Sequence, residues 1–182
     1  MKGVVFTKFI EMVEEKFSIE VADEMIQRAA VPSGGAYSAV GTYDHSEMVA
    51  LLVALSELTN IPIPDLLRTY GRHLFWQFGK LYPSFLEGVA SSIDFVASIE
   101  NVIHVEVRKL YPDAQLPRFE VIEHSPDHLR VRYESERHLG PLALGLIESC
   151  IEYFKESGNV VVRMEPGADS TSPVIFVMDR LS

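Results

Sequence analysis

Three polar residues near the C-terminal third of the chain have the types and spacing to hold an anionic ligand. Tyr133, Ser135 and Arg137 alternate within the segment HLRVRYESER, so in a strand their side chains would share one face. That face would offer two hydroxyls and a guanidinium fork, which together can bind a carboxylate or phosphate group. An internal ion pair with an acidic residue would explain Arg137 equally well. With no general base at fixed spacing and no glycine-rich phosphate loop before a helix, the pattern favours binding a ligand over transforming one.

His104 is the second residue that could carry chemistry. It lies in the segment ENVIHVEVRKLY, beside an apolar stripe formed by Ile103, Val107 and Leu110. A neutral imidazole projecting from an apolar wall can ligate a haem iron. A histidine at the edge of a core, bonded to a backbone carbonyl, has the same sequence pattern, so spacing alone leaves both interpretations open.

Elements of two kinds must position these residues. Helical periodicity predicts helices over residues 4–17, 19–30, 44–58, 64–81, 83–98 and 100–111, with a glycine-containing loop at 31–44. After the proline-rich PDAQLP, alternating patterns predict a hairpin of FEVIEH and HLRVRYESER. A helix over 139–155 and the strands NVVVRME and PVIFVMD follow. We therefore expect an α+β fold, with an N-terminal helical subdomain and then an antiparallel sheet of about four strands with one inserted helix.

Composition narrows the class of protein. The chain has 182 residues and a formal net charge of -10, which argues against binding to nucleic acid or an anionic membrane surface. Its N-terminus lacks the apolar core of a signal peptide, and no apolar run is long enough to span a membrane. The one cysteine, Cys150, excludes an internal disulfide and lies on an apolar row, so we expect a buried thiol and a cytoplasmic protein.

Taken together, these residues resemble the haem-nitric oxide/oxygen binding (H-NOX) family. The resemblance rests on His104, Pro117 and the Tyr-x-Ser-x-Arg triplet of Tyr133, Ser135 and Arg137. It extends to MKG at the start, VIHVEVRKLYPDAQLPRFE in the middle and LGLIESCIEYFKE after the triplet. It thus covers essentially the whole chain.

The resemblance implies one haem-binding domain over residues 1–182, with a distal helical lobe over 1–63 and proximal helices and sheet over 64–182. Haem b (iron protoporphyrin IX) would lie between the two. His104 would be the proximal ligand of the iron, and Tyr133, Ser135 and Arg137 would bind the haem propionates. Pro117 would pack against the porphyrin and distort it from planarity, although an ordinary loop proline would look the same in the sequence.

The resemblance also bears on which gas is bound. Oxygen-binding members carry a distal tyrosine supported by a tryptophan and an asparagine, and the corresponding residues here are the apolar Leu142, Phe9 and Leu74. Val5 and Leu146 would complete this distal pocket. A pocket without a hydrogen-bond donor cannot stabilise the partial negative charge of bound oxygen, so we expect nitric oxide as the ligand and carbon monoxide as a second candidate.

By the same resemblance, the protein would be a gas sensor with no catalysis of its own. Nitric oxide would weaken the iron–histidine bond, and the change would pass to a separate partner, either a histidine kinase or a cyclic-di-GMP cyclase or phosphodiesterase. Some members bind zinc through cysteines around a Gly-Ala-Asp stretch. Here no cysteine surrounds Gly167-Ala168-Asp169, so we expect no zinc.

Two other classes of function remain open on the sequence. In the first, His104 is the general base of an enzyme with an apolar pocket, and Arg137 orients an acidic substrate. In the second, the protein is a haem-free binding module for an acidic, lipid-like ligand.

Overall fold

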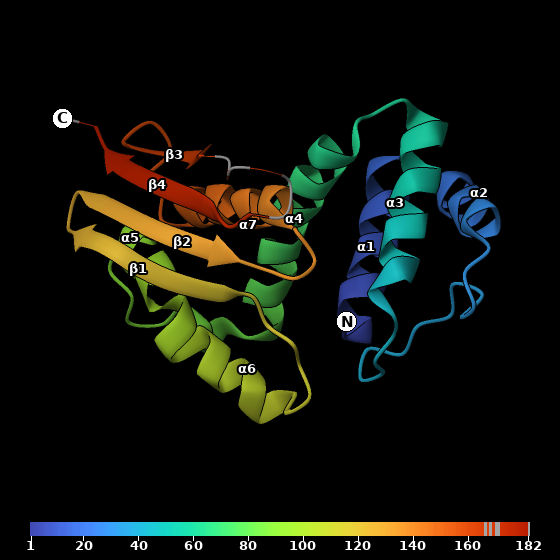
Figure 1. Cartoon of the computed structure of the whole chain (residues 1–182), viewed down its shortest axis with the longest axis horizontal. Helices are drawn as coiled ribbons and strands as arrows, with labels where there is room; N and C mark the ends of the chain where they lie inside the picture. The colour runs from blue at the N-terminus through green and yellow to red at the C-terminus, as the bar shows by residue number, and fades with distance from the viewer. Residues whose placement is uncertain (166, 168, 170–171, 182) are drawn as a thin grey trace. The chain divides into compact units, whose positions relative to one another are not determined.

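The computed structural model describes residues 1–165, 167, 169 and 172–181. It divides into two compact units, Met1–Tyr70 and Gly71–Ser182 (Figure 1). Within the described residues no single helix is long and apolar enough to cross a membrane, and α3 with α4 pass that test only as a pair bent by 110°.

The N-terminal unit is helical. It contains α1 (Gly3–Lys16), α2 (Ile19–Ala29), α3 (His45–Thr59) and the first residues of α4 (Ile63–Leu81). Ser18 caps α2 by accepting a hydrogen bond from the Val21 N–H, and Asp44 caps α3 by accepting one from the Ser46 N–H. Fully buried side chains from all four helices form its core: Phe6, Phe9, Met12, Met25, Leu51, Leu55, Leu66 and Tyr70.

The C-terminal unit combines the rest of α4 with a mixed set of short helices and a sheet. A 3₁₀ turn (Pro83–Phe85) precedes α5 (Ser92–Ser98), a π-helical turn η2 (Ile99–Ile103) and α6 (His104–Leu110). Strands β1 (Arg118–Ser125), β2 (His128–Glu134), β3 (Val160–Glu165) and β4 (Val174–Arg180) form an antiparallel sheet in the order β1-β2-β4-β3. Helix α7 (Gly140–Tyr153) connects β2 to β3, so the predicted α+β fold class is confirmed.

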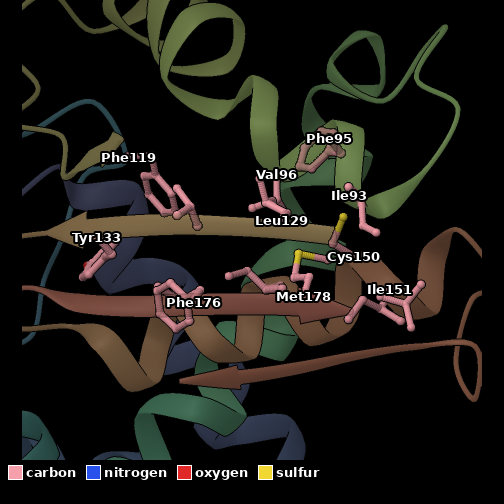
Figure 2. Close-up of a cluster of buried hydrophobic side chains, with 14 of the residues drawn as sticks. Ile93, Phe95, Val96, Phe119, Leu129, Tyr133, Cys150, Ile151, Phe176 and Met178 are labelled. Atoms are coloured by element: carbon pink, nitrogen blue, oxygen red, sulfur yellow. The ribbon is translucent and has the colours of Figure 1, made fainter. Parts of the chain in front are cut away.

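One face of the sheet carries the core of this unit. Helix α5 packs on β2 and α7 packs on β3, and apolar side chains fill the space between these helices and the sheet (Figure 2). From the sheet come Phe119, Leu129, Val131, Tyr133, Phe176 and Met178, and from the helices Ile93, Phe95, Val96, Ile147, Cys150 and Ile151. Cys150 is buried, and this burial raises the pKa of its thiol, so the group behaves as a small apolar side chain.

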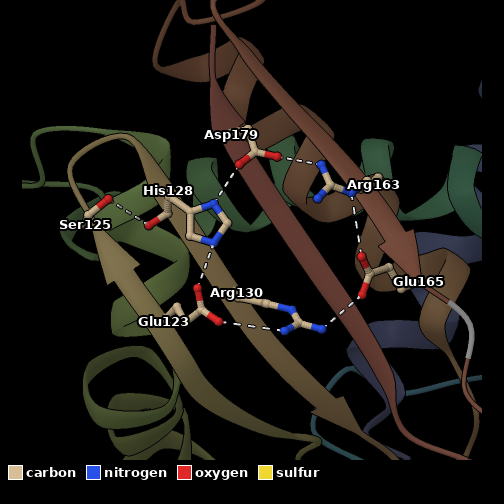
Figure 3. Close-up of polar contacts among 7 residues, drawn as sticks. All are labelled: Glu123, Ser125, His128, Arg130, Arg163, Glu165 and Asp179. Atoms are coloured by element: carbon tan, nitrogen blue, oxygen red, sulfur yellow. Dashed lines mark hydrogen bonds and ion pairs between the residues drawn. The ribbon is translucent and has the colours of Figure 1, made fainter.

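The other face of the sheet is covered by charges. His128 lies between Asp179 and Glu123, and Arg130 contacts both Glu123 and Glu165 (Figure 3). Arg163 joins Asp179 at 2.5 Å and Glu165 at 3.7 Å. The alternation along β2 thus separates an apolar inner face from a charged outer face.

Two predicted elements differ from the structure. The helix predicted over residues 83–98 is broken, because Gly88 adopts a φ of +75° and Ser91 starts a new helix by accepting a hydrogen bond from the Asp94 N–H. The apolar stripe predicted beside His104 is also not a buried face. Leu110 is 52 % exposed, and among the residues of α6 only His104 is buried.

Helices α4 and α7 approach each other closely at a glycine. A Cβ atom added to Gly71 would lie 2.1 Å from the Leu142 carbonyl oxygen, which is far inside van der Waals contact. Because the obstacle is backbone, relief requires the two helices to move apart.

We therefore expect Gly71→Ala to lower the free energy of unfolding by about 1–3 kcal/mol, as overpacking does in other cores. Gly79→Ala in the same helix is the control, because its Cβ would meet only the movable end of Leu86 at 3.3 Å. The helix propensity of alanine should leave that variant unchanged or slightly more stable. Urea denaturation of both variants measures the difference, and equal midpoints would contradict the steric argument.

Candidate functional site

His104 occupies the first position of α6, directly after the π-helical turn, and is only 8 % exposed. Its Nδ1 atom lies 3.2 Å from Oε2 of Glu100, one turn earlier in the chain. π-helical turns widen a helix locally and recur at functional sites. The turn η2 therefore sets the direction in which this imidazole points.

The Glu100 carboxylate has further partners. Its Oε2 accepts a hydrogen bond from the Phe119 backbone N–H of β1 at 3.0 Å, and its Oε1 accepts one from Nη2 of Arg108 at 3.1 Å. Burial alone would raise the pKa of Glu100, but these bonds and the one with His104 outweigh it and hold the pKa below its usual range. Glu100 is therefore a carboxylate at neutral pH.

Burial and the Glu100 contact together determine the protonation state and the tautomer of the histidine. Burial lowers the pKa of His104, with the Glu100 contact opposing it, so the ring is neutral at physiological pH. An ionised carboxylate can only accept hydrogen bonds, which places the single ring proton on Nδ1. The lone pair of Nε2 is then available as a ligand for a metal ion.

Aromatic rings connect His104 to the sheet. The ring centroid of His104 lies 5.7 Å from that of Phe119 on β1, and Phe119 lies 5.2 Å from Tyr133 on β2. Tyr133 in turn lies 5.7 Å from Phe176 on β4, and every contact in this row is edge-to-face. The row ties His104 and Tyr133 into one packed unit, and both of these side chains are buried.

The triplet is only partly on a strand. Tyr133 lies on β2 and is 5 % exposed, whereas Ser135 and Arg137 follow the end of β2 at Glu134. Pairing between the strands stops there. In register, Ser135 would face Pro117 before β1 and Glu134 would face Pro173 before β4, and proline has no N–H to donate to the ladder. The prediction that one strand face presents all three side chains is therefore wrong for Ser135 and Arg137.

A tight turn arranges Ser135 and Arg137 instead. The Ser135 hydroxyl accepts a hydrogen bond from the Arg137 backbone N–H at 3.2 Å, and the Ser135 carbonyl accepts one from the His138 N–H at 3.1 Å. Burial raises the pKa of Tyr133, while its hydrogen bond with Ser135 and the charge of Arg137 oppose this rise. The three residues thus remain neighbours, although the backbone route differs from the predicted one.

The Arg137 side chain lies against the loop that contains Pro117. Its guanidinium donates to the backbone carbonyl of Gln115 and to the Gln115 side-chain oxygen, both at 2.8 Å. Both acceptors are neutral, so the positive charge remains available to an anion. A cavity of about 290 Å³ adjoins this contact and is lined by residues of the loop and the turn, namely Gln115, Leu116, Pro117, Ser135, Glu136 and Arg137.

These features fit a haem group. A neutral histidine with an available Nε2 suits the iron, apolar and aromatic residues surround it, and hydroxyl and guanidinium donors suit the propionates. Among the described residues, no group of three or more His, Cys, Asp or Glu side chains could hold a metal ion without such a cofactor. Of the Gly-Ala-Asp stretch considered for zinc, Ala168 lies outside the described residues.

The residues expected on the distal side are apolar, and they fall in both units. Leu74 of α4 is 3 % exposed, and Leu142 and Leu146 are partly buried on α7 in the C-terminal unit. Val5 and Phe9 lie on α1 in the N-terminal unit, where Phe9 contacts Tyr70 edge-to-face at 5.1 Å.

Sequence reasoning missed Tyr70, a buried tyrosine beside Phe9. Its hydroxyl donates to the Val5 carbonyl oxygen, so this hydroxyl already has an acceptor within the protein. It also missed Glu100, Arg108 and Gln115, although the spacing of Glu100 four residues before His104 was a usable signal.

Comparisons with known proteins settle the family. The family model for Haem-NO-binding (HNOB) proteins matches residues 2–162. The chain belongs to the H-NOX family. Members of this family are haem-binding gas-sensor domains.

Solved structures agree with this assignment. The Fe(II) unliganded H-NOX protein from K. algicida is 40% identical, with a TM-score of 0.90 over 100% of this chain and 97% of that one. The H-NOX from Shewanella woodyi, solved with IWP-051 bound in the Fe(II)CO state, is 37% identical, with a TM-score of 0.83 over 100% and 95%. The H-NOX from S. oneidensis in the Fe(II)NO state is 22% identical with a TM-score of 0.90 over 100% of both chains, which shows the shared fold. The search of curated proteins found no match.

Proposed function

We propose that this H-NOX protein is a cytoplasmic nitric oxide sensor that holds haem b through His104, excludes oxygen and signals to a separate protein. The observation that carries this proposal is the state of His104: a buried, neutral imidazole whose Nδ1 proton is committed to Glu100. Such an imidazole presents Nε2 as the free ligand atom. Haem bound there would supply an iron that can bind a diatomic gas.

The other residues would hold and shape the cofactor. Arg137 and Ser135 lie beside the cavity next to Pro117, where they can donate hydrogen bonds to propionate oxygens. Tyr133 supplies a third donor at the end of β2. Arg137 would then be shared between a propionate and Gln115, which links cofactor binding to the loop of Pro117.

The choice of gas would follow from the apolar distal residues. Val5, Phe9, Leu74, Leu142 and Leu146 have no side-chain donor, and bound oxygen needs one far more than nitric oxide or carbon monoxide does. Tyr70 does not change this argument, because its hydroxyl is bonded to the Val5 carbonyl.

Signalling would start at His104. Since His104 begins α6 and packs on Phe119 of β1, a change in its restraint reaches both a helix and the sheet. By resemblance to the family, the receiver would be a histidine kinase or a cyclic-di-GMP cyclase or phosphodiesterase, and the chain itself would have no catalytic activity.

One observation also fits an enzyme. A histidine whose Nδ1 contacts a carboxylate is the pair that orients a general base in hydrolases. Haem uptake separates these functions. An enzyme that uses His104 as a general base does not need haem, and neither does a binding module for an acidic lipid-like ligand, so neither protein needs to show the Soret absorption band of bound haem.

The first test concerns the proximal ligand. Protein produced with haem supplied should show a Soret band that shifts with nitric oxide, and His104→Gly should lose five-coordinate ferrous haem unless imidazole is added. The control is His124→Gln, which alters a half-exposed histidine on β1 that contacts Asp94. A His104→Gly spectrum identical to the wild type would show that another residue ligates the iron.

The second test concerns the triplet. Arg137→Gln should speed haem transfer to apomyoglobin about tenfold or more, as expected from losing a hydrogen bond between charged groups worth about 1.5–3 kcal/mol. Arg132→Gln is the matched control, because Arg132 lies on the outer face of β2, the strand that precedes Arg137, and pairs with Glu120. Equal rates of haem transfer for both variants would show that Arg137 does not hold the haem.

The third test concerns gas selectivity. Ferrous protein exposed to air should stay unliganded or oxidise, and Tyr70→Phe should give the same spectra because the hydroxyl is already used by Val5. A stable oxygen complex in the wild type would show that a donor reaches the gas. Its loss in Tyr70→Phe would identify Tyr70 as that donor.

A further inference from the structure

The Glu100 carboxylate joins three elements at one point. Oε2 contacts His104 Nδ1 at 3.2 Å and the Phe119 N–H of β1 at 3.0 Å, while Oε1 contacts Arg108 Nη2 at 3.1 Å. Its side chain is 27% exposed, compared with 10% for that of His104. The polar contact with the imidazole is therefore partly shielded from water, where an electrostatic interaction keeps more of its strength.

The backbone explains why these groups meet. Glu100 lies within the π-helical turn η2, and the His104 N–H bonds to the Ile99 carbonyl across this turn. The wide turn directs Glu100 and His104 to the same side, facing the start of β1. Phe119 then fixes both residues, since its N–H binds the carboxylate and its ring packs on the imidazole at 5.7 Å.

A carboxylate bound to Nδ1–H increases the electron donation of Nε2. In metal sites, such outer partners fix the tautomer and orientation of a ligating histidine and raise its basicity. A cation on the other carboxylate oxygen draws charge away and reduces that effect. Arg108, with a side chain 47% exposed, is placed to do so here.

We propose that Glu100 is a positioning residue that sets the strength of the His104–iron bond, with Arg108 reducing its influence. This inference rests on the proposed haem function. It adds a second residue that determines the strength of the iron–histidine bond, beside the ligand His104 itself. A stronger bond resists the release of His104 when nitric oxide binds, so the pair would set how readily the gas triggers the sensor.

The two partners should act with opposite signs. Glu100→Gln keeps the shape and an acceptor oxygen but removes the charge. It should shift the iron–histidine stretching band to lower frequency, raise the Fe(III)/Fe(II) reduction potential and speed haem loss about tenfold. Arg108→Gln leaves the carboxylate uncompensated, so its band should shift to higher frequency and its potential should fall.

A third variant controls for charge alone. Glu106→Gln removes one carboxylate from α6, where Glu106 pairs with the exposed Lys109 at 2.6 Å. Resonance Raman spectra of the ferrous proteins and spectroelectrochemical titrations compare all three variants with the wild type, and circular dichroism checks that each is folded. Glu106→Gln should leave the stretching band in place.

The results separate the two proposals. Opposite shifts in Glu100→Gln and Arg108→Gln support the inference, whereas shifts of the same sign, or none, overturn it. If Glu100→Gln fails to fold, the Arg108→Gln shift decides alone, because this exposed side chain can be changed without disturbing the core. Wild-type protein that takes up no haem, or binds it without His104, overturns the proposed function instead.

Discussion

Pairing of β2 on both of its edges is the constraint on which the C-terminal unit depends. Strand β2 bonds to β1 on one side and to β4 on the other, so its register fixes which side chains enter the core. A shift by one residue would replace Leu129, Val131 and Tyr133 in the core with Arg130, Arg132 and either His128 or Glu134. The same ladder ends where Pro117 and Pro173 follow in register, and the turn of Ser135 and Arg137 forms at that end.

The candidate site thus includes the turn that follows the end of β2, a strand held by pairing on both sides. Two polar groups of the site have partners within the C-terminal unit: Glu100 contacts His104 and accepts a hydrogen bond from the Phe119 N–H, and Arg137 donates to both oxygens of Gln115. Unpaired, each of these groups would cost free energy on burial. In the proposed function, this paired arrangement would let an incoming propionate exchange with a neutral Gln115 oxygen at Arg137.

The sequence predicted well what depends on local pattern. Periodicity and capping residues located α1, α2, α3, α4 and α7, and alternation located the strands, because burial of one face dictates the pattern. The helix over residues 83–98 was misjudged although Gly88 and Ser91 were visible. Apolar periodicity was given more weight there than the helix-breaking residues.

The residues of the candidate site also divide into those that the sequence could predict and those that it could not. The residue types at His104 and Tyr133 could be read directly, whereas the partners Arg108, Gln115 and the Phe119 N–H depend on which segments fold together. The end of β2 was also beyond reach, because Pro117 and Pro173 terminate it only through a register set by distant strands. Long-range pairing, not local preference, decided each of these features.

The π-helical turn limits how such a site can change during evolution. Each residue in an α-helix turns the chain by about 100°. Deleting one residue from Ile99–Ile103 would restore ordinary helical geometry and rotate all of α6 by roughly that angle. His104 would then face another direction with its own chemistry intact. The site therefore depends on a count of residues as much as on their identity, and homologues that keep the histidine but not the length of this turn would orient it differently.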